Sequence, residues 1–93
     1  MRRRRFDHLA VELSVEVGAA IPRWALWTAL RELGHDPEAL SAEAAASFCD
    51  GPLQRFLHLQ GLRLPPHRAR RLRRRVTRYD PRHPTPEEIF ARF

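Results

Sequence analysis

Apolar side chains recur three or four residues apart along most of the chain, which is the spacing of one helix face. Gly, Pro and Asp-Pro separate these groups and are typical of helix ends and starts. The pattern predicts helices over 6–20, 23–33, 41–50, 52–60, 66–79 and 86–93, with a short turn at 36–40. It therefore predicts an all-α fold, a compact orthogonal bundle of five or six short helices.

The first of these segments also allows a strand. Apolar residues stand at every second position from Leu9 to Val17, which is the period of a strand. The stripe from Phe6 through Leu13 to Val17 fits a helix instead. Because no later segment alternates in the same way, a strand would have to pair with another chain. We therefore expect a helix.

The segment 23–33 is the most apolar of the predicted helices. Large apolar side chains cover most of its circumference: Trp24, Leu26, Trp27, Leu30 and Leu33. A helix that is apolar on most sides is typically buried. We expect this one to be the central helix of the core.

Polar residues mark two further helix starts. Ser41 can cap the helix that follows it, with Leu40 and Ala45 placed as a hydrophobic staple. Thr85 can cap the last helix, with Pro86 in its first turn.

Charge is distributed very unevenly. The chain of 93 residues fits one domain, and its 17 basic residues are all Arg, with a net charge of +6. Residues 6–62 hold three Arg and eight acidic residues, whereas residues 63–82 hold nine Arg and one acidic residue. Residues 2–5 are four more Arg. We predict a basic N-terminal arm over 1–5 and a single helical domain over 6–93.

The segment 66–79 combines an apolar stripe with dense positive charge. Ala69, Leu72, Val76 and Tyr79 lie on one narrow face at helical spacing. Arg residues fill most of the remaining circumference. The segment is therefore expected to be a surface amphipathic helix that docks on the body through its stripe.

The planar Arg fork suits phosphate oxygens, and a polyanion would relieve the repulsion between like charges on one helix. The sequence predicts a small non-enzymatic nucleic-acid-binding protein, an accessory or subunit of a nucleoprotein assembly. An all-Arg face contacts phosphate rather than reading bases, and about six phosphate contacts would give a log–log salt slope near −5 on duplex DNA. The predicted contact residues are Arg68, Arg70, Arg71, Arg74, Arg75 and Arg78, helped by Arg2, Arg3, Arg4 and Arg5.

Three alternatives stay open at this point. The Arg face could pair with an acidic partner protein, or with a second copy in head-to-tail assembly. The chain's own carboxylates could neutralise it internally, or it could be a solvated face in a chain that uses Arg in place of Lys. The candidate acidic residues are Glu12, Glu16, Glu32, Asp36, Glu38 and Glu43.

Helix number also bears on these alternatives. About six short helices in some ninety residues resembles the death-fold class of adaptor domains, a likeness that covers the whole chain without any shared motif. It implies a protein-interaction module and transfers no residues. A helix-turn-helix over 41–60 is not favoured, since Arg55 is the only fixed cation of its second helix.

No combination of residues predicts catalysis, a metal site or a cofactor. Cys49 is the only cysteine, and no two of the five His are spaced three or four residues apart. There is no Gly-rich phosphate loop. No apolar run is long enough to cross a membrane. We expect a cytoplasmic protein with no enzymatic role and no membrane partner.

Overall fold

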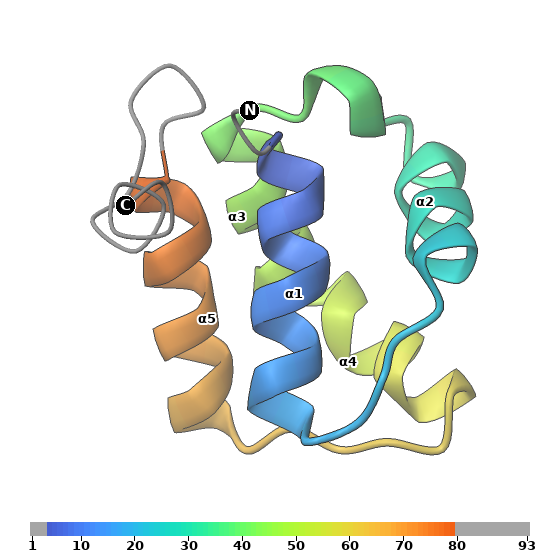
Figure 1. Cartoon of the computed structure of the whole chain (residues 1–93), viewed down its shortest axis with the longest axis vertical. Coiled ribbons are helices and arrows are strands. Elements are labelled where there is room, and N and C mark those ends of the chain that lie inside the picture. Colours follow the sequence, from blue (N-terminus) through green and yellow to red (C-terminus); the bar gives the residue numbers. More distant parts are fainter. Residues whose placement is uncertain (1–3, 80–93) are drawn as a thin grey trace, which may run out of the picture.

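The computed structural model describes residues 4–79 and contains no strand within that range. The predicted all-α bundle is confirmed (Figure 1). The elements are α1 (Arg5–Val17), α2 (Arg23–Glu32), the short 3₁₀ helix η1 (Pro37–Ala39), α3 (Ala42–Asp50), α4 (Pro52–Leu59) and α5 (Pro66–Arg78). The helix predicted over 86–93, with its cap at Thr85, lies outside the described residues.

The ambiguous first segment is a helix. Phe6, Leu9 and Leu13 are buried on one side of α1, as the helical stripe predicts. Val11 and Val15, which created the strand-like alternation, point to solvent with 41% and 66% of their surface exposed. A helix buries the stripe without needing a partner chain, so the chain satisfies its own backbone hydrogen bonds.

The expectation that residues 23–33 form the central helix is wrong. Only Leu26 and Leu30 of α2 are buried, while Trp24 is 74% exposed and Leu33 is 46% exposed. The helix lies at the edge of the bundle, on the far side of α1 from α5 (Figure 1). Because α2 docks mainly through one narrow stripe, Trp24 and Leu33 remain at the surface, while Trp27 is partly buried and packs edge-on against Phe6 with ring centroids 5.3 Å apart.

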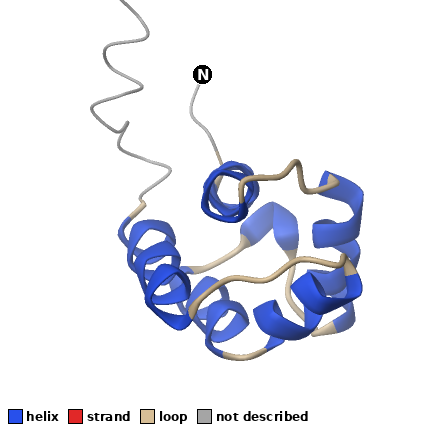
Figure 2. Cartoon of the chain, turned by 90° about the horizontal axis from the view of Figure 1, so that it is seen from below, coloured by secondary structure: helices blue, strands red, loops and turns tan. Residues whose placement is uncertain are grey.

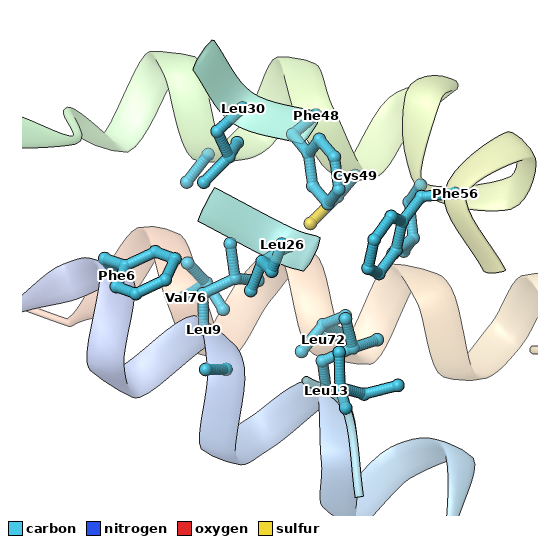
Figure 3. Close-up of a cluster of buried hydrophobic side chains, with 14 of the residues drawn as sticks. Phe6, Leu9, Leu13, Leu26, Leu30, Phe48, Cys49, Phe56, Leu72 and Val76 are labelled. Atoms are coloured by element: carbon cyan, nitrogen blue, oxygen red, sulfur yellow. The ribbon is translucent and has the colours of Figure 1, made fainter. Parts of the chain in front are cut away.

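The core is built mainly between α1, α3, α4 and α5. Figure 3 shows side chains from these helices, together with α2, meeting in one cluster. The α5 stripe is confirmed: Leu72 and Val76 are fully buried, Tyr79 is buried and Ala69 is partly buried. The inner face of α5 is therefore committed to the fold, and its other faces are free to carry charge.

Two predicted boundaries also hold. The Ser41 hydroxyl accepts a hydrogen bond from the Ala44 N–H at 3.0 Å and caps α3. The Leu40 and Ala45 side chains on either side of that cap are both buried. The Asp36 carboxylate caps η1 by accepting from the Glu38 N–H at 3.0 Å.

Candidate nucleic-acid interface on helix α5

Helix α5 runs antiparallel to α1 along one edge of the bundle (Figure 1). It has 13 residues, of which seven are Arg and none is acidic. Such a helix is about 20 Å long. Pro66 occupies its first turn, where a residue without an N–H costs nothing. Every one of its Arg side chains is exposed, but their surroundings differ.

One side of α5 faces the acidic residues of α1. The Arg71 guanidinium forms two parallel hydrogen bonds to Glu16, Nε to Oε1 and Nη2 to Oε2, each 3.0 Å long. Arg75 donates through Nη1 to Glu12 at 3.1 Å and to Glu16 at 3.4 Å. Arg68 donates to the Glu16 carbonyl oxygen at 3.2 Å. We call Arg68, Arg71 and Arg75 the paired flank.

Glu16 is the centre of the paired flank. Its side chain is only 2% exposed, so an unpaired carboxylate there would be costly. The hydrogen bonds from Arg71 lower the pKa of Glu16 below its usual range, against the opposite effect of burial, and nearby Arg75 and Arg68 act in the same direction. The same hydrogen bonds raise the pKa of Arg71. These charges are engaged in holding α5 to α1.

On the side of α5 toward α3, the described residues form a single ion pair. Arg73 Nε lies 2.9 Å from Asp50 Oδ1. Asp50 is the last residue of α3, where the helix dipole is negative, so Arg73 stabilises that helix end. A shallow hollow of about 430 Å³ lies beside this pair, lined by Asp50, Arg70, Arg73 and Arg74.

The outermost face of α5 is different. Arg70, Arg74 and Arg78 are exposed and have no ion pair or side-chain hydrogen bond with any residue of 4–79. They stand four residues apart and form a row about 12 Å long on one side of the helix. We call these three residues the open ridge. It is the part of the predicted Arg face that remains available to an anion.

The two N-terminal arginines that the structure describes, Arg4 and Arg5, form contacts that stabilise the fold. Arg4 pairs with Asp7 at 3.2 Å and also with Glu38. Arg5 is the first residue of α1, not part of a separate arm. Arg2 and Arg3 lie outside the described residues.

Arg5 reaches the far end of α5. It donates to the carbonyl oxygens of Leu40 at 2.8 Å, Tyr79 at 2.6 Å and Val76 at 3.3 Å. The last carbonyls of a helix have no partner within it, so Arg5 acts as a cap for α5. No local signal could have found this role, because the carbonyls that Arg5 caps at the end of α5 lie more than seventy residues further along the chain.

The predicted acidic residues also divide into a paired group and an unpaired group. Within one chain, Glu12 and Glu16 form ion pairs with Arg71 and Arg75 of the paired flank, and Glu38 is held by Arg4. Glu32, Asp36 and Glu43 are exposed and form no ion pair within the described range. Internal neutralisation is therefore real but partial, and it stops short of the open ridge.

Other chemistry finds little support in the described part of the chain. No group of three or more His, Cys, Asp or Glu side chains could hold a metal ion there. Burial, first of all, raises the pKa of the Cys49 thiol to about 12, so this cysteine is a neutral core residue. None of the helices between residues 4 and 79 is long and apolar enough to span a bilayer.

Comparison of the chain with protein-family models, curated proteins and solved structures gives no match.

Proposed function

We propose that the protein binds nucleic acid through phosphate contacts made by the open ridge of α5, as a non-enzymatic accessory or subunit of a nucleoprotein assembly. One observation carries this proposal: three exposed guanidiniums stand in a row on one helix, and none of them forms an ion pair with a carboxylate of the described chain.

The energetics of the ridge support a polyanionic partner. Arg70 and Arg74, and again Arg74 and Arg78, are like charges one helical turn apart, which destabilises a helix by roughly 0.2–0.5 kcal/mol per pair. Phosphate groups would remove that repulsion. Each guanidinium can also offer two parallel N–H donors to one phosphate.

The paired flank limits the number of contacts. Phosphate binding by Arg71 would compete with its bonds to Glu16, and a buried carboxylate would have to share its main partner. We therefore reduce the proposed contact residues from six α5 arginines to the three of the open ridge. Three phosphate contacts would give a log–log salt slope near −2.7 on duplex DNA, compared with about −5 for six.

A direct test measures fluorescence anisotropy of a labelled DNA duplex of about 16 base pairs at about 50 and 200 mM salt. The ridge variant carries Arg70→Gln, Arg74→Gln and Arg78→Gln. The control variant carries Arg31→Gln, Arg55→Gln and Arg63→Gln, which removes the same charge from exposed arginines with no ion pair in 4–79.

We expect the native chain to lose about 40-fold in affinity between the two salt concentrations, as a slope of −2.7 requires. The ridge variant should bind about tenfold more weakly or worse, and the control variant within about threefold of the native chain. Absence of binding at the lower salt, or equal losses in both variants, would overturn the proposal.

The second candidate is a helical adaptor, death-fold-like in helix number, that binds an acidic protein or a second copy. One observation favours it: Glu32 and Asp36 are exposed on the α2–η1 side of the bundle, away from the open ridge (Figure 1). Head-to-tail contact would bring these unlike charges together. Light scattering that shows mass rising with concentration without nucleic acid, and losing that rise in the ridge variant, would favour this candidate instead.

A further inference from the structure

Resting on the proposed function, we infer that the nucleic acid is a B-form DNA duplex and that α5 lies in its major groove with the open ridge facing the bases. The inference adds a class of nucleic acid and a binding geometry to phosphate contact alone. It stands on the contacts that hold α5, on the position of α5 and on the residues near it.

Helix α5 is held at both ends. Arg5 caps its C-terminal carbonyls, and the Arg68 and Arg71 bonds to Glu16 hold its N-terminal half against α1. Arginine-rich segments that recognise irregular RNA commonly fold on binding. In contrast, α5 is a helix of 13 residues that side-chain hydrogen bonds hold to the body at both ends. A preformed helix of this kind fits the regular groove of a duplex.

The position of α5 leaves its outer side accessible. Seen along α1, it occupies a corner of the bundle, with none of the described helices outside it (Figure 2). A helix with its side chains is about 10–12 Å wide, and the B-DNA major groove is about 12 Å wide. The major groove of A-form RNA is deep and narrow and does not admit side chains in this way. The dimensions therefore favour DNA over duplex RNA.

The aromatic residues of the body are placed badly for binding single strands at α5. Proteins that bind single strands stack bases on exposed rings beside their basic groove. Helix α5 contains no Phe, Tyr or Trp, and Tyr79 just beyond it is buried and stacked on His8 with ring centroids 4.3 Å apart. The exposed Trp24 lies on α2, at the opposite edge of the bundle. The face of α5 offers charge without stacking platforms, which suits a duplex.

Within the groove, one arginine of the open ridge would contact a guanine in addition to the phosphate contacts of the other two. The most common specific contact of Arg with DNA is its two-pronged bond to guanine N7 and O6. Arg70 and Arg78 lie about 12 Å apart along the helix axis, which corresponds to roughly three or four base-pair steps. One ridge residue would thus meet a guanine while the other two contact phosphates, and two phosphate contacts would bring the log–log salt slope to about −1.8. The contact would leave a footprint at guanine N7.

The test compares one sequence of about 16 nucleotides as DNA duplex, RNA duplex and single-stranded DNA at the same salt concentration. We expect the DNA duplex to bind about tenfold more tightly than either of the others. Bound protein should protect a short run of guanine N7 atoms from methylation by dimethyl sulfate. The control variant should keep this protection and the ridge variant should lose it.

Three results would count against the inference, and they separate it from the proposed function. Equal affinity for the three nucleic acids, with the ridge variant still defective, overturns the duplex and leaves phosphate binding in place. A preference for duplex DNA without N7 protection overturns the groove geometry alone. Failure to bind any of the three overturns both the inference and the proposed function.

Discussion

The paired flank and the open ridge of α5 consist of the same residue type on the same helix, yet the flank holds α5 to α1 and the ridge remains unpaired within the described chain. Arg71 and Arg75 form ion pairs with the carboxylates of α1, whereas Arg70 and Arg74 form none with any carboxylate of the described chain. The difference teaches that the count of arginines is a poor guide to a binding surface. What decides the role of each guanidinium is the group that the fold places across from it.

The two regions also differ in their effect on the stability of the folded protein. The flank satisfies a buried carboxylate, and its loss would leave Glu16 without its main partner in a site that is 2% exposed. The ridge stabilises nothing in the described body and adds repulsion between its own members. Substitutions in the paired flank should therefore lower the stability of the fold, and substitutions in the open ridge should leave it unchanged or raise it slightly.

The largest expected effect comes from Arg71→Met compared with Arg74→Met. Both remove one charge and keep a good helix former, but only Arg71→Met strips Glu16 of its two parallel hydrogen bonds. We expect Arg71→Met to lower the urea midpoint by about 1–2 M and Arg74→Met to leave it nearly unchanged. Equal midpoints for the two variants would abolish the distinction between flank and ridge.

A second prediction concerns an arginine from the other basic segment. Arg5→Met removes three hydrogen bonds to backbone carbonyls, two of them at the end of α5, and should lower the free energy of unfolding by about 2 kcal/mol. Arg4→Met removes only exposed ion pairs and should cost well under about 1 kcal/mol. Chemical denaturation followed by tryptophan fluorescence measures both. A smaller loss for Arg5→Met than for Arg4→Met would refute the capping role.

The third prediction uses pH to isolate Glu16. Because its pKa is lower in the folded chain than in the unfolded chain, Glu16 adds stability that is complete above the ordinary value of 4.5 and is lost as the pH falls from there through the folded pKa. Glu16→Gln should therefore be clearly less stable than the native chain at pH 7. The gap should close progressively below about pH 4.5, where carboxyl groups begin to bind protons.

Urea unfolding of both proteins between pH 7 and pH 3 measures that gap. The other carboxylates titrate in both chains, so their contributions cancel in the difference. Glu43→Gln, which changes an exposed residue with no ion pair in the described range, serves as the matched control and should show no such gap. A gap for Glu16→Gln that stays constant down to pH 3 would contradict the assignment.

The smallest effect should have the opposite sign. The ridge variant removes two like-charge pairs one turn apart and should raise the free energy of unfolding by roughly 0.4–1 kcal/mol. The control variant should change it by less. Thermal unfolding at low salt measures both, and added salt should shrink the gain because it screens the repulsion. A ridge variant less stable than the native chain would reveal a structural role for these arginines.

Much of the fold could be predicted from patterns among residues that are close together in the sequence. Ser41 and Asp36 cap the elements that follow them, and the spacing of Ala69, Leu72, Val76 and Tyr79 predicts the buried face of α5. These features could be predicted because a helix and its caps depend on residues only a few positions apart. The basic character of α5 was equally plain, since charge is a property of composition.

Which arginines are engaged was decided by the tertiary structure alone. The carboxylate bound by Arg71 and the α5 carbonyls bound by Arg5 lie more than fifty residues away along the chain, and no periodicity encodes such a meeting. The exposure of Trp24 was missed for the same reason, because its apolar character does not reveal which side of α2 meets the core. The amino-acid sequence determined that one helix would carry dense positive charge. Only packing determined how much of that charge remained open, because electrostatic pairing depends on distance in space rather than along the chain.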